Sequence, residues 1–203
     1  MRVSVLAVMA ACATLGVPLR AQQPIESPDF VFVKKGPLAA ILRTDMPYEI
    51  GDTRDSIIVP TGFVTDFASI PRALWSRISP VDEYKLAAVV HDYLYWYQPC
   101  ERGEADNLLA IAMEEEGVAF SDRAAVYAGV RAGGAQAWKS NSALRDAGEI
   151  RLVPRDAGRP GPLETWDDFR RRLKSRGVKG SPGRMPRQKY CDYGSSRVVP
   201  KRR

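Results

Sequence analysis

The chain contains a single histidine, His91, and only three cysteines among its 203 residues. One histidine excludes any metal site that needs two imidazole ligands, and any imidazole base in this protein must be His91. No internal repeat is present, and no nucleic-acid recognition motif accompanies the basic residues. The search for candidate catalytic residues therefore centres on His91.

The amino terminus predicts an export signal over residues 1–21. A short positive start precedes an apolar run from Val3 to Leu19, and Ala21 provides a small residue at the cleavage point. A lipoprotein signal ending at Cys12 is the alternative that fits less well, because the apolar run continues past this cysteine. We therefore expect a periplasmic or secreted protein.

Export leaves Cys100 and Cys191 as the cysteines of the mature chain. An oxidising compartment permits a disulfide between them, and two separate thiols are the alternative. A disulfide would tie the C-terminal segment to the loop after the helix that carries His91.

Charge divides the chain into an acidic body and a basic tail. Residues 22–138 have 10 Lys and Arg against 17 Asp and Glu, whereas residues 139–203 have 18 against 7. The length allows one substantial core. We expect a single domain over residues 22–138 and a basic, partly disordered tail rich in Pro, Gly and Arg over residues 139–203.

The body has an α+β pattern, with a small antiparallel β portion packed on a three-helix core. Short apolar runs bounded by turn residues predict strands over residues 30–33, 38–42, 48–50 and 56–59. Apolar residues at three- and four-residue steps predict helices that begin near Asp82, Glu101 and Ser121 and end near Tyr97, Glu116 and Trp138. In the tail, one short amphipathic helix is predicted from Thr165, which forms a capping box with Asp168.

Polar residues are concentrated between Thr65 and Asp106. His91 and Asp92 are adjacent, so on a helix their side chains point about 100° apart and cannot bond to each other. Asp106 lies fifteen residues after His91, near the start of the next helix. Because the two helices should be antiparallel neighbours, we expect the Asp106 carboxylate to orient the imidazole.

Asp92 is then available for another role. A carboxylate near the backbone carbonyls of the loop over residues 61–67 suits calcium, which binds oxygen ligands. Asp66 would supply a second carboxylate. A cation beside an imidazole that activates water would favour ester hydrolysis.

Two runs resemble an uncharacterised bacterial and phage family, domain of unknown function 1353. These are Gly62-x-x-Thr65-Asp-Phe-Ala-Ser-Ile-Pro-Arg72 and Ala87-Ala-Val-Val-His-Asp-Tyr-Leu-Tyr95. The later Ala105-Asp106 and the stretch from Val130 to Trp138 fit the same family, so the resemblance covers about residues 30–138. It implies no activity.

The helix with His91 is also similar to that of phospholipase A2. This resemblance implies that His91 is the base, Asp92 a calcium ligand, Asp106 the orienting carboxylate and Tyr95 a supporting hydrogen-bond donor. The flanking half-cystines of the secreted enzymes are absent, and the glycine-rich calcium loop is reduced to Gly62.

Each of these residues also has a purely structural interpretation. His91 can be a buried histidine bonded to a backbone carbonyl. Asp66 and Ser69 can form a turn that caps a short helix, with Arg72 paired to Asp92 or Asp106. Ser69 as a nucleophile with His91 has no supporting nucleophile-elbow pattern.

The function expected from the sequence is a hydrolase with a His91–Asp106 pair, calcium-assisted, that acts on an ester such as a phospholipid. A non-catalytic interaction module of phage origin is the alternative. The basic face of the helix after Thr165 fits an anionic membrane surface, and docking of this helix on its own domain is the competing interpretation. No nucleic-acid partner is expected.

Overall fold

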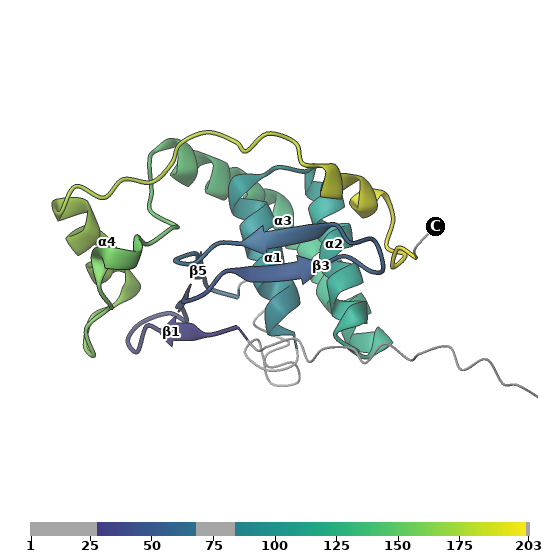
Figure 1. Cartoon of the computed structure of the whole chain (residues 1–203), viewed down its shortest axis with the longest axis horizontal. Coiled ribbons are helices and arrows are strands. Elements are labelled where there is room, and N and C mark those ends of the chain that lie inside the picture. The colour runs from purple at the N-terminus through teal and green to yellow at the C-terminus, as the bar shows by residue number, and fades with distance from the viewer. Residues whose placement is uncertain (1–27, 68–83, 202–203) are drawn as a thin grey trace, which may run out of the picture.

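A computed structural model describes residues 28–67 and 84–201 and shows an α+β protein (Figure 1). The fold class predicted from the sequence is therefore confirmed. The predicted export segment and the two candidate residues Ser69 and Arg72 lie outside the described residues.

Within the described residues, five short strands form two antiparallel sheets. β1 (Phe30–Phe32), β2 (Ala40–Leu42) and β5 (Val64–Thr65) pair in the order β1-β2-β5. β3 (Met46–Glu49) and β4 (Ser56–Val59) form a separate hairpin. The sequence did not predict β5, because a strand of two residues is too short to show a period of two.

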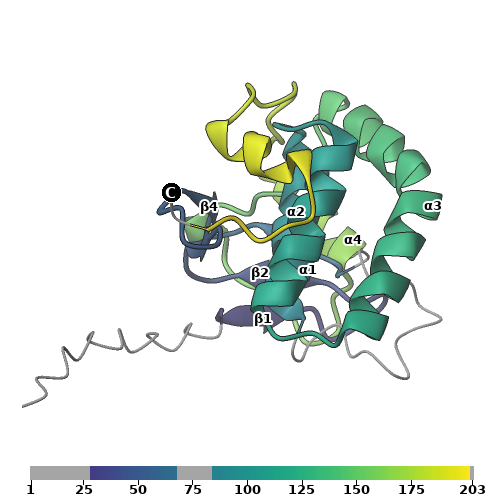
Figure 2. The same cartoon turned by 90° about the vertical axis from the view of Figure 1, so that its right-hand side faces the viewer.

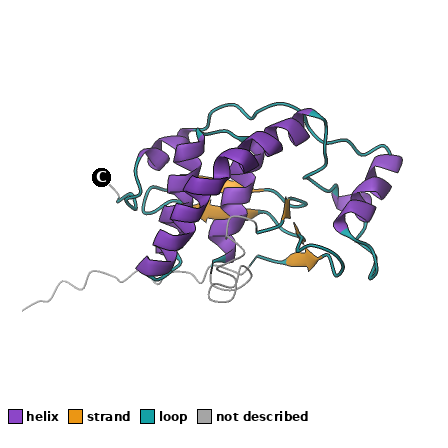
Figure 3. Ribbon diagram, turned by 180° about the vertical axis from the view of Figure 1, so that it is seen from behind, coloured by secondary structure: helices purple, strands orange, loops and turns teal. Residues whose placement is uncertain are grey.

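The β3–β4 hairpin lies across the helices and gives them one apolar face (Figure 1). Met46 and Tyr48 alternate with the exposed Pro47 and Glu49. Successive side chains of a strand point to opposite faces, so the alternation predicts one buried face. Seen from behind, the helices lie in front of these strands (Figure 3).

α1 (Lys85–Tyr97) is the central element of the core. Every residue from Leu86 to Trp96 is buried, because α1 contacts α2 (Arg102–Glu115), α3 (Phe120–Asp146), β4 and β5. Figure 2 shows α1 beside α2, with α3 passing along their edge. A helix buried on all sides has to find partners inside the protein for each of its polar side chains.

A carboxylate from another helix caps the start of α1. The backbone N–H groups of Leu86 and Ala87 donate to the Glu116 carboxylate over 3.2 and 3.1 Å. Glu116 directly follows α2, so the end of α2 is fixed to the start of α1. The Glu116 oxygen atoms accept hydrogen bonds from N–H groups that have no partner within the helix.

α3 continues eight residues past Trp138, where the sequence predicted that it would end. Its last turn carries Arg145, which is only 2% exposed and donates from Nη1 to the Trp96 carbonyl over 2.5 Å. Nη2 of Arg145 donates to Gln98 Oε1 over 3.3 Å. Because the composition becomes polar after residue 138, the sequence pattern did not show that the helix continues there. Arg145, the one buried cationic side chain of α3, binds the end of α1.

The segment after α3 packs on the body instead of extending from it. Residues 189–195 form a short 3-10 helix, η3 (Lys189–Ser195), that lies on α2 (Figure 2). Gly194 lies so close to α2 that a Cβ atom there would be 2.5 Å from the Glu104 carbonyl oxygen. Arg187 forms a two-point ion pair with Glu104.

A disulfide joins Cys100, in the loop between α1 and α2, to Cys191 in η3. Of the two alternatives left by the sequence, the structure therefore contains the cross-link. It secures the contact of η3 with α2 covalently.

The amphipathic helix predicted in the tail is α4 (Trp166–Ser175), and Thr165 and Asp168 form its capping box. Phe169 and Leu173 are fully buried in a second core with residues of β2, β5 and the segment after α3. On the other face, Arg170, Arg171 and Arg172 pair with Asp167, Asp168 and Glu164. The apolar face of α4 is thus used by the protein itself. No helix in the described ranges is long and apolar enough to cross a membrane.

Removal of the disulfide should destabilise the protein. Cys100 and Cys191 are separated by 91 residues. Because a cross-link over so long a loop restricts the unfolded chain, the double variant Cys100→Ser/Cys191→Ser should lose about 2–4 kcal/mol of unfolding free energy. Urea denaturation measures this loss, and an unchanged midpoint would contradict it.

The cap formed by Glu116 should make stability depend on pH. Burial raises the pKa of Glu116 from 4.5 to about 7, against the lowering effect of the hydrogen bonds from Ala87 and Leu86. The folded state therefore binds more protons than the unfolded state between these two values, and stability should fall as pH rises from about 4.5 to 7.

Glu116→Gln keeps an acceptor for the two N–H groups but cannot ionise. Since Glu116 is partly exposed, we expect this variant to be more stable than the wild type by about 1–2 kcal/mol at pH 8 and equally stable near pH 4. Urea denaturation at both pH values checks the difference. A constant difference between the two proteins at all pH values would assign the pH dependence to another group.

Candidate functional site

Asp106 is the centre of a buried polar cluster that connects the three long helices. The Asp106 side chain is 0% exposed. Its Oδ1 lies 3.2 Å from His91 Nε2 and accepts a 2.5 Å hydrogen bond from the Tyr95 hydroxyl. Its Oδ2 accepts from Arg102 over 3.0 Å and from Arg131 over 2.8 Å. His91 and Tyr95 come from α1, Arg102 from α2 and Arg131 from α3.

The charge of Asp106 determines which nitrogen of His91 carries the proton. Burial acts to raise the pKa of Asp106, but the hydrogen bonds from His91, Tyr95 and Arg131 outweigh it and hold the pKa below its usual value. An ionised carboxylate can only accept hydrogen bonds. Nε2 of His91 is therefore the donor, and Nδ1 is the basic nitrogen of the neutral ring.

Tyr95 reaches Asp106 because α3 has a glycine, Gly134, at the point where it passes the Tyr95 hydroxyl. A Cβ atom at Gly134 would lie 2.3 Å from the Tyr95 hydroxyl oxygen and 3.3 Å from an Arg102 nitrogen. The Tyr95 ring also lies 4.1 Å from the His91 ring, measured between centroids, and contacts Trp138 edge-on. Gly134 thus makes room for the donor that supports the pair.

Asp92 points to a different partner, as the helix geometry requires. Its Oδ2 accepts from the Thr65 hydroxyl over 2.5 Å and from the Phe67 N–H over 3.1 Å. Phe67 has a φ of +52°, and its buried ring lies within 5.8 Å of Phe30. Because a residue other than glycine rarely adopts positive φ, the two bonds to Asp92 stabilise a strained turn after β5.

Asp66, the second predicted calcium ligand, faces an arginine. Its Oδ1 lies 3.3 Å from Nη2 of Arg151. A guanidinium group in this position already supplies the positive charge that a calcium ion would bring. In the part of the chain that the structure describes, three side chains able to ligate a metal meet only at Cys100, Glu104 and Cys191, where both sulfur atoms belong to the disulfide.

These residues surround a pocket with a volume of about 350 Å³, called the His91 pocket below. Its α1 wall contains His91, Asp92 and Tyr95. The α3 wall is made of residues with small or short side chains at four-residue steps, so this wall lies close to the helix backbone. The lining residues from α3 and beyond include Gly129, Gly133, Ala137, Asn141 and Arg151.

Sequence reasoning brought together His91, Tyr95 and Asp106, and it predicted Asp92 and Asp66 as ligands of one calcium ion. In the structure both of these carboxylates line the His91 pocket. It missed Arg102, Arg131 and Arg151. The position of Arg102, four residues before Asp106 on one helix, was a readable signal for an ion pair. Arg151 reaches Asp66 across 85 residues of chain, and no local pattern could indicate that contact.

Residues 41–130 match the family model described as Protein of unknown function (DUF1353). The resemblance expected from the sequence is therefore confirmed for this part of the chain. The match includes the loop before α1, all of α1 and α2 and the first eleven residues of α3, and it contains six of the eleven residues that line the His91 pocket. Neither the curated proteins nor the solved structures gave a match.

The role of Gly134 can be separated from the general effect of glycine in a helix. Gly134→Ala should push the Tyr95 hydroxyl away from Asp106 and cost about 1–3 kcal/mol of unfolding free energy, because a buried hydrogen bond is lost. Gly133→Ala is the matched control, since no described atom lies within 4 Å of the added Cβ.

The control should be neutral or more stable by about 0.5–1 kcal/mol, as alanine is the better helix former. Thermal or urea unfolding of the two variants measures the contrast. Equal effects at positions 133 and 134 would show that Tyr95 does not depend on this contact.

Proposed function

We propose that the protein is a hydrolase in which His91 is the general base and Asp106 its orienting partner, acting on an ester such as a phospholipid. The observation that carries the proposal is that His91, which lines a pocket, has its Nε2 atom 3.2 Å from a fully buried, ionised Asp106. The resemblance of this helix to that of phospholipase A2, which rests on the sequence pattern alone, implies the same assignment.

The proposed reaction uses the basic nitrogen of His91. Nδ1 takes a proton from a water molecule as its oxygen attacks the ester carbonyl carbon, and Asp106 stabilises the imidazolium that forms. Collapse of the tetrahedral intermediate breaks the bond to the alcohol oxygen, which receives the proton from His91. Acid and alcohol are released, and the base is restored.

The oxygen that becomes negatively charged needs a positive group or hydrogen-bond donors. Arg151 lines the same pocket and is held by Asp66, so we assign this role to its guanidinium group. Asp92 is assigned to the turn at Phe67. Calcium assistance, with Asp92 and Asp66 as ligands, is the version of the mechanism that the test below separates from this one.

One observation favours the non-catalytic alternative. Asp106 accepts hydrogen bonds from four donors on three helices. A cluster of this kind can have the purely structural role of holding the helices together. In that case the protein is an interaction or structural module, and His91 contributes to stability alone. The two functions predict different outcomes for the same variant.

The purified protein should release fatty acid from mixed phosphatidylglycerol–phosphatidylcholine vesicles or hydrolyse 4-nitrophenyl butyrate. His91→Gln retains an N–H donor for Asp106 but has no base, so kcat should fall by about 10²–10⁴-fold while the melting temperature stays close to that of the wild type. Initial rates and thermal unfolding of both proteins provide the two readouts.

Each assay is run with calcium and with EDTA. Unchanged rates in EDTA support Arg151 as the source of positive charge, and loss of activity that calcium restores supports a metal at Asp92 and Asp66. No release of product from either substrate, or a His91→Gln variant with wild-type rates, would refute the hydrolase proposal.

A further inference from the structure

Folding gathers positive charge at one end of the molecule. β1, β2, α4 and the segment after α3 share the second core, and we call residues 28–43 and 149–180 the α4 lobe. The lobe has 12 Lys and Arg against 6 Asp and Glu, whereas the other described residues have 12 against 15. Figure 1 shows the lobe at one end of the molecule, away from α2. The folded protein therefore has a basic lobe and an acidic remainder.

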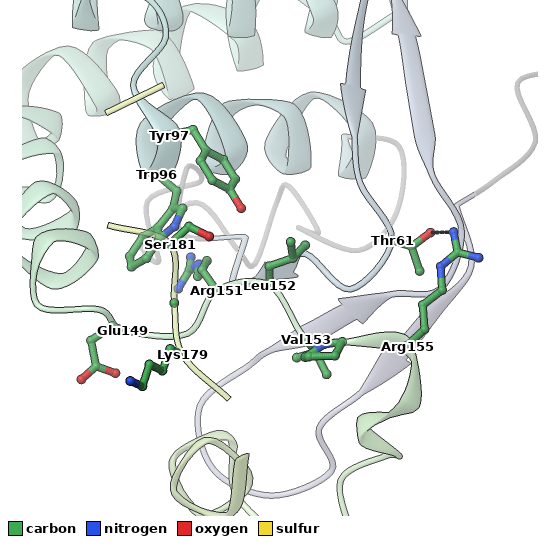
Figure 4. Close-up of a pocket in the computed structure, with 12 residues that line it drawn as sticks. Thr61, Trp96, Tyr97, Glu149, Arg151, Leu152, Val153, Arg155, Lys179 and Ser181 are labelled. Atoms are coloured by element: carbon green, nitrogen blue, oxygen red, sulfur yellow. Dashed lines mark hydrogen bonds between the residues drawn. The ribbon is translucent and has the colours of Figure 1, made fainter. Parts of the chain in front are cut away.

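The cations on the side of the lobe that faces α1 have polar or acidic neighbours. Arg155 donates to the Thr61 hydroxyl over 3.2 Å, and the Lys179 ammonium group lies beside Glu149 (Figure 4). Three arginines of α4 are paired with acidic residues of the same lobe. The positive charge that these groups do not offset lies on another part of the lobe.

Two loops form the outer end of the lobe. The turn between β1 and β2, residues 34–37, lies against the loop before α4, residues 158–165. Lys35 forms a parallel bridge with Thr165, and a Cβ atom at Gly36 would lie 3.3 Å from Thr165 Cγ2. Figures 1 and 3 show both loops at the same end of the molecule. We call this pair of loops the lobe tip.

The lobe tip combines exposed cations with an exposed apolar side chain. Lys34, Lys35 and Arg159 are exposed. Leu163 is 79% exposed, more than any other large apolar residue that the structure describes, and Pro162 restricts the backbone just before it. A single exposed leucine is ordinary on a protein surface. Its position in a pair of loops with three cations is the combination that binds lipid surfaces, because cations attract anionic headgroups and the apolar group enters the interface.

We propose that the lobe tip docks on the surface of an anionic lipid bilayer. Leu163 enters the boundary between headgroups and acyl chains, and Lys34, Lys35 and Arg159 contact the headgroups. One leucine and three cations give a weak, reversible contact, as is usual for peripheral binding. The net charge of the lobe orients the protein as it approaches, because the acidic remainder is repelled. The contact goes beyond the proposed hydrolysis and does not require it.

Sedimentation of the purified protein with vesicles at about 0.15 M salt tests the proposal. It should bind vesicles of phosphatidylglycerol and phosphatidylcholine but not vesicles of phosphatidylcholine alone. Lys34→Gln/Lys35→Gln should weaken binding about 10–30-fold, since each cation near an anionic surface contributes about fivefold. Leu163→Asn leaves the charge unchanged and should weaken binding several-fold, because the apolar contact is lost.

Matched variants outside the lobe are the controls. Lys139→Gln/Lys201→Gln removes the same charge from two exposed lysines, and Val198→Asn changes an apolar residue that is 72% exposed. Both should bind vesicles like the wild type. Equal weakening by the two double variants would assign the binding to overall charge and overturn the proposal. Binding that Leu163→Asn leaves unchanged would also overturn it, as would the absence of binding to the anionic vesicles.

Two further measurements separate this proposal from its rivals. Binding of a DNA duplex that Lys34→Gln/Lys35→Gln abolishes, without vesicle binding, would assign the tip to a polyanion and overturn the membrane contact. His91→Gln should bind vesicles like the wild type, because the tip does not include the His91 pocket. Vesicle binding without release of fatty acid refutes the hydrolase proposal and supports docking. Fatty acid release with no vesicle binding refutes docking alone.

Discussion

The arrangement of the helices depends on a single buried carboxylate. An isolated charge in a protein interior is strongly destabilising unless it is paired and hydrogen-bonded. Asp106 is satisfied only when α1, α2 and α3 all bring donors to it, through His91, Tyr95, Arg102 and Arg131. The helices can therefore pack in few other ways, and the same requirement fixes the orientation of the one imidazole in the protein.

The second constraint is that α1 is buried on every side. Its adjacent polar residues His91 and Asp92 must then find partners in opposite parts of the molecule. His91 faces Asp106 among the helices, and Asp92 faces Thr65 and Phe67 at the edge of the small sheet. One dipeptide thereby connects the helical core with the β portion. A pocket forms where these two networks approach each other and α3 presents only short side chains.

The predictable and the unpredictable features differ in the range over which residues interact. The helix period around His91 and the position of Asp106 in the next helix follow from local rules, and so does the capping box at Thr165. Contacts that join distant segments left no such trace. Arg151 against Asp66 and η3 against α2 depend on how the tail folds back. The basic composition after residue 138 suggested a loose tail, although many of its arginines are paired within the fold.

The tail therefore does more than cover the body. It contributes Arg145 to the end of α1, Cys191 to a cross-link and Arg151 to the wall of the His91 pocket. The Arg151 guanidinium group is paired with Asp66 and lies 5.5 Å from the centre of the Trp96 ring. Because Asp66 and Arg151 both line the His91 pocket, the folded tail sets part of the charge at the proposed site through Arg151.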